Sequence, residues 1–141
     1  KKVENKVLAP EGMGPPKNKD EADRILAQAK KAEKALKWSA ARLQYRRLSK
    51  AKDRRLRAIG FDGMGRASWQ LKHLDRAIEA AEQALRQGAG VSSRRVLANA
   101  HYRKGNYKEA IKHYDQILKR NKNDREAKLL RKKAKQKLKK R

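Results

Sequence analysis

Apolar residues recur at intervals of three and four along most of this chain, which is the spacing of one face of an α-helix. From residue 19 onward the chain has no proline and is rich in Ala, Leu, Lys, Arg, Gln and Glu, which are good helix formers. The chain lacks the alternation of apolar and polar residues that is typical of a strand. The pattern therefore predicts an all-α protein, with apolar faces at four groups of positions: Ile25, Leu26, Ala29 and Ala32; Ala41, Tyr45 and Leu48; Ala77, Ala81 and Ala84; and Ala110, Tyr114 and Ile117.

Residues 1–18 differ from the rest in composition. They hold all three prolines, and Pro15 and Pro16 favour extended backbone around them. Asp20 and Glu21 then supply the acidic first turn that a helix start prefers. We therefore expect an extended arm or linker over 1–18 and a helical domain over 19–141.

Three alanines, Ala41, Ala77 and Ala110, mark an internal repeat. Their spacings are 36 and 33 residues, within the range typical of solenoids and arrays. The residues four and seven positions further on are apolar in every copy. The residue twelve positions earlier is always small: Ala29, Gly65 or Ala98. Because small residues let two helices approach closely, the repeat predicts a series of helical hairpins.

The turns inside these hairpins are expected at 36–38, 71–75 and 104–107. In the last of them, Gly105 is expected to be left-handed at the end of one helix, and Asn106 to cap the start of the next. The glycine and asparagine in this otherwise helical stretch therefore predict a turn between two antiparallel helices.

With helices and turns in this order, the pattern resembles the tetratricopeptide repeat, a helix-turn-helix unit of about 34 residues. The resemblance implies a right-handed solenoid of about seven helices, with repeats at about 22–55, 58–91 and 92–124 and a capping helix at 125–141. The chain departs from the family pattern at Gln28, Lys72, His101 and Lys122. Residues 97–124 match it most fully, at Leu97, Ala98, Gly105, Tyr107, Ala110, Tyr114 and Ile117.

The C-terminal segment is expected to cover the last repeat, because a solenoid needs a polar outer face at its end. Leu129, Leu130, Ala134 and Leu138 are the apolar residues available for this contact. After Glu126 there is no acid and there are nine basic residues. The segment is either a solvated cap or a basic handle for an anion.

The net charge of the chain indicates which classes of partner to expect. The chain has 41 Lys and Arg residues against 15 Asp and Glu, a formal net charge of +26. Such a balance favours anionic partners: nucleic acid, an acidic protein or a phosphorylated segment. The absence of cysteine excludes disulfides and suits a reducing compartment, so we expect a cytoplasmic location. No apolar run reaches the roughly 20 residues of a membrane span, and we expect no membrane partner.

Residues that carry catalysis or hold metals are scarce. The histidines are expected in a turn (His73), in the core (His101) and on an outer helix face (His113), with no two of them and a carboxylate at ligand spacing on one face. No serine-nucleophile motif is present. We therefore expect no enzyme activity, no catalytic residue, no cofactor and no metal.

The glycine-rich stretch 60–65 lacks the spacing of a phosphate-binding loop. We expect it to be a loosened helix start that Asp62 could cap. Gly65 is expected to pack closely against a neighbour, whereas Gly60 and Gly63 are expected only to weaken the helix.

The first helices of the repeats are expected to line an extended concave groove. The resemblance implies that a basic wall with two aromatics faces it. Trp69 and Tyr102 there either offer flat apolar contact area or pack between adjacent repeats. Of the family's carboxylate clamp for chaperone tails, Arg95 and Asn99 are present, whereas Leu130 stands where an asparagine is expected. The expected partner-binding residues are Lys30, Lys34, Arg66, Trp69, Gln70, Arg95, Asn99, Tyr102, Arg103, Lys133 and Lys137.

These patterns lead to one main hypothesis and two alternatives. The main one is a non-enzymatic protein-protein interaction or scaffold module that binds an acidic or extended segment of a partner in a basic concave groove. The first alternative is an RNA-binding component of a ribonucleoprotein, with lysines on phosphates and a steep salt dependence. The second is a spacer that self-associates through the exposed ends of its repeats.

Overall fold

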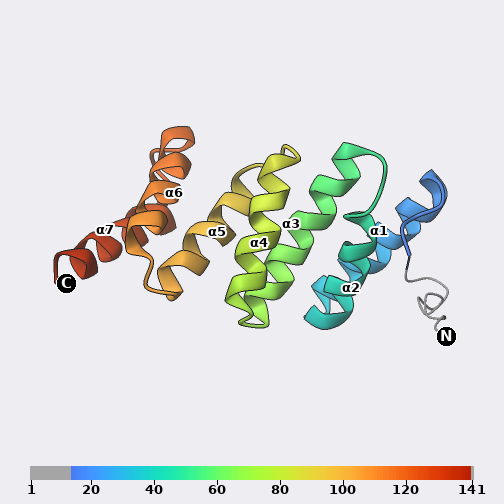
Figure 1. The fold of residues 1–141 in the computed structure, drawn as a ribbon, viewed down its shortest axis with the longest axis horizontal. Helices are drawn as coiled ribbons and strands as arrows, with labels where there is room; N and C mark the ends of the chain where they lie inside the picture. Colours follow the sequence, from blue (N-terminus) through green and yellow to red (C-terminus); the bar gives the residue numbers. More distant parts are fainter. Residues whose placement is uncertain (1–13, 141) are drawn as a thin grey trace, which may run out of the picture.

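The computed structural model describes residues 14–140 of the chain (Figure 1). Within this range the backbone forms seven α-helices and no strand, so the prediction of an all-α helical repeat is confirmed; the hand of the solenoid stays a prediction. The helices are α1 (Lys19–Lys34), α2 (Trp38–Leu48), α3 (Arg54–Gln70), α4 (Leu74–Arg86), α5 (Val91–Arg103), α6 (Tyr107–Arg120) and α7 (Arg125–Lys139).

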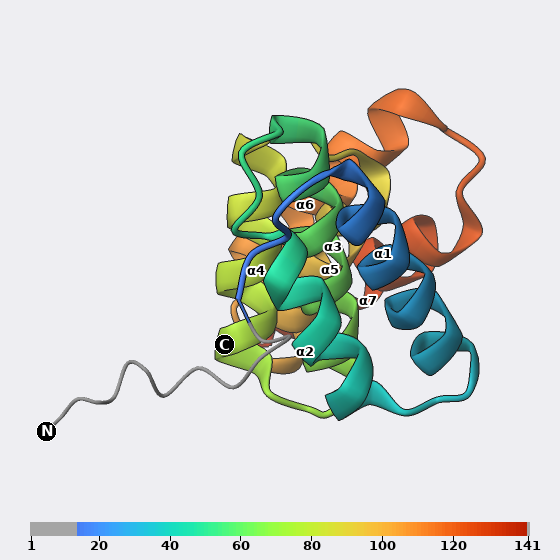
Figure 2. The same cartoon turned by 90° about the vertical axis from the view of Figure 1, so that its right-hand side faces the viewer.

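The helices form three hairpins and a final helix arranged in a row. In Figure 1 the row runs from α1 on the right to α7 on the left, and Figure 2 looks along it from the α1 end. Each helix packs against the next one in the chain, and α3 also contacts α5. The first members of the hairpins are therefore α1, α3 and α5, and the second members are α2, α4 and α6.

The repeated alanines occupy equivalent positions. Ala41, Ala77 and Ala110 are each the fourth residue of the second helix of a hairpin, and all three are fully buried. Two large side chains, Tyr45 and Tyr114, follow four residues later and are also buried. A methyl group at the alanine position lets the two helices of a hairpin approach closely, and the Tyr45 ring one turn further packs on Gly63 of the next hairpin.

The glycine-rich stretch 60–65 lies in the middle of α3, so the expected helix start there is wrong. The helix begins at Arg54, where the side chain of Asp53 accepts a hydrogen bond from the backbone N–H of Arg55 at 2.7 Å. The expectation for Gly65 is also wrong, because a Cβ atom there would meet only ordinary contacts at 3.6 Å or more. The close approaches are at Gly60, which packs on the backbone at the end of α2, and at Gly63, which packs on a tyrosine ring of α2.

Asp62, expected as a cap, instead lies inside α3. Its carboxylate accepts from the Ser93 hydroxyl at 2.5 Å and pairs with Arg66 one turn further along the same helix. Asp62 therefore links α3 to α5 rather than starting a helix.

The three hairpin turns share one backbone conformation. Leu36, Lys72 and Gly105 each lie two residues before a second helix, with φ of 60°, 65° and 83°. The following N–H donates to the carbonyl five residues back in each turn, for example from Asn106 to His101 at 2.8 Å. The left-handed conformation expected at Gly105 is confirmed. Asn106 precedes α6, but its side chain makes no capping hydrogen bond, so that expectation is wrong.

Lys72 holds the left-handed conformation at a steric cost of about 1–2 kcal/mol, because its Cβ approaches the following carbonyl. We expect Lys72→Gly to raise the free energy of unfolding by about 1 kcal/mol after the greater entropy of unfolded glycine is subtracted. Urea denaturation measures the difference. Lys72→Ala is the matched control, since it removes the same charge and keeps the Cβ; equal stability of the two variants would contradict the explanation.

The ends of the described range differ in part from the expectations. Asn18 caps α1 by accepting from the Glu21 N–H at 2.8 Å, and residues 14–18 have no regular structure. Residues 1–13 of the predicted arm and residue 141 of the predicted capping helix lie outside the described residues, and the domain boundaries stay predictions. In α7, Leu129 is 53% exposed, so its expected packing is wrong. Ala134 is buried as expected, and Ala127 is buried where Leu129 was expected to pack, because Ala127 and Ala134 share a helix face with Leu130.

None of the helices within residues 14–140 combines the length and the apolar character needed to cross a bilayer.

Candidate partner-binding groove

A cavity of about 450 Å³ lies along the odd-numbered helices. Side chains from α1, α3, α5 and α7 line it, together with the first residue of α2. Five of the expected binding residues meet here, on α3 and α5. The lining residues are Glu33, Trp38, Arg66, Trp69, Gln70, Val91, Ser92, Arg95, Val96, Asn99 and Glu126. We refer to this cavity as the groove.

The other expected binding residues are outside this lining. Arg103 places its guanidinium 5.6 Å from the centre of the Trp69 ring, and Tyr102 packs edge-on against Tyr107 at 5.6 Å between ring centres. Both therefore contact other aromatic side chains. The remaining four are exposed lysines of α1 and α7: Lys30, Lys34, Lys133 and Lys137.

Arg66 is held by acidic side chains of the chain itself. Its Nε atom lies 2.7 Å from Glu33 Oε2 and its Nη2 atom 3.0 Å from Glu33 Oε1, which joins α3 to α1. Its Nη1 atom pairs with Asp62. The hydrogen bond from Arg66 holds the pKa of the Glu33 carboxyl below its usual value, and the same pairing raises the pKa of Arg66. This arginine therefore stabilises the wall of the groove.

Arg95 is held in the same way at the other end of the groove. Its guanidinium donates to both carboxylate oxygens of Asp124, at 3.0 and 2.6 Å, and to Glu126 at 2.9 Å. Asp124 also caps α7 by accepting from the Ala127 N–H at 3.0 Å. The Arg95 hydrogen bond lowers the pKa of Asp124. Since Glu33 and Glu126 face the same cavity as the two arginines, the charges on the groove lining balance.

Asn99 is oriented for hydrogen bonding by a buried tyrosine. The Tyr114 hydroxyl donates to Asn99 Oδ1 at 2.6 Å, which turns the amide so that its NH₂ group remains available. Burial raises the pKa of Tyr114, so the phenol stays neutral and keeps donating. The groove thus contains a fixed amide donor beside Val96 and Trp69.

Comparison with known protein families matches residues 63–126 to the tetratricopeptide repeat. Residues 63–126 belong to the tetratricopeptide repeat family. The matched segment contains α4, α5 and α6 with most of α3. Comparison with curated proteins gives no match. Tetratricopeptide repeats generally mediate protein-protein interaction or scaffolding, as non-enzymatic modules.

Several residues of the groove were missed by sequence reasoning. Trp38 was assigned to a turn, yet it begins α2 and faces the groove. Glu33 and Glu126 were missed because their roles depend on arginines of a neighbouring hairpin. Val96 could have been found from the sequence, because it follows Arg95 directly and lies one helical turn before Ala100 on a buried face. The groove is accordingly more apolar and less basic than expected.

His101 and His113 lie side by side. His113 is buried, so its assignment to an outer helix face is wrong, and His101 is half-buried rather than fully in the core. Their rings stack with centres 6.0 Å apart, and one ligand atom each of His101, His113 and Glu109 lie within 4.8 Å of one another. Sequence spacing along a single helix could not reveal this group, because it comes from α5 and α6.

In this group, one ring nitrogen of His113 already has a hydrogen-bond partner. Arg94 Nη1 lies 3.2 Å from Nδ1 of His113, and a guanidinium can only donate, so Nδ1 accepts and Nε2 carries the proton. Nε2 faces Glu109 at 3.9 Å. A metal ion at Nε2 would require the ring proton to move to Nδ1. Nδ1 would then be a hydrogen-bond donor facing the Arg94 guanidinium, which can only donate. We therefore do not propose a metal site here.

Proposed function

We propose that this chain is a non-enzymatic interaction module that holds an extended segment of a partner protein in the groove. The observation that supports this most is the lining itself, in which apolar and hydrogen-bonding side chains converge from four successive odd-numbered helices. An extended segment offers alternating side chains and free backbone groups, which suit a long surface of this kind.

The central contacts are expected to be apolar and amide-based. Trp69 and Trp38 provide broad, stiff surfaces that lose little entropy on binding. The NH₂ group of Asn99 can donate to a backbone carbonyl of the segment. Because Arg66 and Arg95 already have carboxylate partners, a carboxylate of the ligand would have to compete with them.

Acidic residues of the partner are expected at the rim. Lys30 and Lys34 are exposed on α1, and Arg103 is exposed at the end of α5. Exposed charges of this kind steer an acidic partner and speed its association more than they add affinity. A segment with an apolar centre and acidic flanks therefore fits the groove best.

Peptide selection tests this proposal. A random peptide library displayed on phage is selected against the protein, and an enriched peptide is labelled and titrated by fluorescence anisotropy. We expect Ser92→Trp, which fills the groove, to weaken binding at least about tenfold. Ser39→Trp is the matched control, since both serines are exposed second residues of helices and only Ser92 lines the groove. Equal affinity of the two variants, or no enrichment, would overturn the proposal.

A nucleic-acid partner is the second candidate, and α7 favours it. Beyond Glu126 this helix has no acid, and it carries six exposed lysines: Lys128, Lys132, Lys133, Lys135, Lys137 and Lys139. A labelled RNA titrated at two salt concentrations measures this activity. RNA binding through α7 would weaken with a log-log slope of about −0.7 per neutralised phosphate and would be insensitive to Ser92→Trp.

A further inference from the structure

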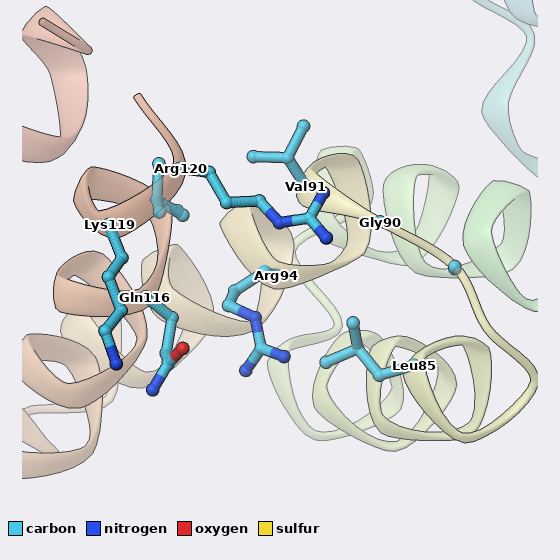
Figure 3. Close-up of a pocket in the computed structure, with 9 residues that line it drawn as sticks. Leu85, Gly90, Val91, Arg94, Gln116, Lys119 and Arg120 are labelled. Carbon is cyan, nitrogen blue, oxygen red and sulfur yellow. The ribbon is translucent and has the colours of Figure 1, made fainter. Parts of the chain in front are cut away.

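A second cavity, of about 420 Å³, lies between the end of α4, the start of α5 and the end of α6 (Figure 3). It shares only Val91 with the groove. Figure 3 shows Arg94 from α5 and Arg120 from α6 extending into the space between these helices, with Gln116 and Lys119 on the α6 side. We refer to this cavity as the cationic pocket. Its lining residues are Leu85, Ala89, Gly90, Val91, Arg94, Gln116, Ile117, Lys119 and Arg120.

The cationic pocket has three positive side chains and no acidic residue in its lining. Among residues 14–140, Lys119 and Arg120 make no side-chain hydrogen bond or ion pair, and Arg94 makes one, to His113. Like charges brought together in a concave site repel one another, and the walls of the site strengthen the field. An anion in the pocket would remove this repulsion.

The arginines of the groove and the arginine Arg94 of the cationic pocket differ in the charge of their partners. Arg66 and Arg95 in the groove each pair with two carboxylates of the chain. In the pocket, the partner of the Arg94 guanidinium among the described residues is His113, which stays uncharged because burial and the neighbouring Arg94 lower its pKa to about 4. His113 therefore orients Arg94 without neutralising it, and the remaining N–H groups of the guanidinium stay available.

The lining also indicates which anion fits. It contains no aromatic side chain, so there is no platform on which a nucleic-acid base could stack. Leu85, Val91 and Ile117 form an apolar part that can contact the aliphatic portion of a ligand. A phosphate monoester carries a charge of about −1.5 to −2 and three acceptor oxygens, which suits two arginines and a lysine.

We propose that the cationic pocket binds a phosphate monoester group, as carried by a phosphoserine or phosphothreonine residue of a partner protein. The charged oxygens meet Arg94, Lys119 and Arg120, and the peptide that carries the phosphate lies over the apolar part. This site is separate from the groove, and its occupation does not depend on the function proposed for the groove.

Nuclear magnetic resonance titration of the whole chain tests the proposal. The probes are inorganic phosphate, a capped five-residue peptide with phosphoserine between alanines, and the same peptide with serine, all at constant ionic strength. We expect both phosphate-bearing probes to shift the backbone amides of Gly90, Val91 and Arg94, with the phosphopeptide binding more tightly, and the serine peptide to shift none.

Variants identify the side chains responsible. Arg120→Gln and Lys119→Gln should each weaken phosphopeptide binding about tenfold, as expected for the loss of a charge-assisted hydrogen bond. Lys108→Gln is the matched control, because Lys108 is an exposed cation of α6 outside the pocket lining. It should change the affinity less than about twofold, since its charge acts only through screened solvent.

Three results would overturn the proposal. The first is a loss of affinity in Lys108→Gln equal to that in Arg120→Gln, which would show attraction by net charge alone. The second is a set of shifted amides confined to α7. The third is tighter binding of a labelled oligouridine than of the phosphopeptide in the pocket, which would assign the site to a phosphodiester. The Ser92→Trp variant should bind the phosphopeptide normally, so failure of one site does not imply failure of the other.

Discussion

Gly60→Ala should lower the free energy of unfolding by about 2 kcal/mol or more. The new Cβ atom would lie 2.6 Å from the Tyr45 carbonyl oxygen and would also overlap the backbone of Leu48 and Ser49 at the end of α2. Backbone atoms of a packed helix cannot move aside, so α2 and α3 must separate, and overpacking of this kind typically costs about 1–3 kcal/mol or more. The gain in helix propensity of about 1 kcal/mol offsets only part of this. Urea denaturation followed by circular dichroism measures the change.

Gly65→Ala is the matched control for this result. It lies in the same helix, and its Cβ would meet Ala81 N at 3.6 Å and Val96 Cγ1 at 3.7 Å, which are ordinary contacts. This variant should therefore be as stable as the native chain or more stable, by up to about 1 kcal/mol. If Gly60→Ala were as stable as Gly65→Ala, the close approach of α2 and α3 would be contradicted.

Acidification from pH 7 to pH 4 should destabilise the fold through His113, by roughly 3 kcal/mol, since a pKa difference of 1 between the folded and unfolded states corresponds to about 1.4 kcal/mol. Burial, with the positive charge of Arg94, lowers the pKa of this imidazole from 6.5 to about 4. Between these two values the unfolded state binds a proton that the folded state does not, so the free energy of unfolding falls as pH falls. Burial also lowers the pKa of the stacked His101, which adds to the same trend.

The variant His113→Asn isolates this contribution. Its amide oxygen can accept from Arg94 near the position of Nδ1, and it does not titrate. We expect the fall in stability between pH 6.5 and 4 to be smaller in the variant by roughly the His113 contribution. The same pH dependence in His113→Asn and the native chain would contradict the assignment.

The repeat itself was predictable from the sequence because its determinants are local. Ala41, Ala77 and Ala110 recur with apolar residues one and two turns further on, and helix periodicity depends only on such spacing. Gly105 was predictable for the same reason, since a glycine between two helical patterns indicates a left-handed turn. Lys72 and Leu36 adopt the same conformation without the usual residue, so the turn geometry follows from the packing of the helices it connects.

The missed features depend on residues that are distant in the sequence. Gly65 was expected to be the tight glycine, but closeness depends on where α2 passes over α3, and it passes over Gly60 and Gly63. Arg66 and Arg95 were expected to bind a partner, but Glu33 of α1 and Asp124 at the start of α7 hold them. No spacing along one helix indicates that Glu33 or Asp124 will reach them. The composition correctly indicated an excess of positive charge. It could not show which basic side chains have no acidic partner in the fold.

The packing of helices mainly against their neighbours in the chain has a mechanical consequence. Every substantial helix-helix contact among residues 14–140 joins consecutive helices, apart from that between α3 and α5, so tension on the two ends would act on the junctions in series and open the weakest one first. The outermost junction at the α7 end is held by a helix that buries only two alanines. Under load this helix would detach first, and the chain would lengthen in steps, with the centre of the row the last to open.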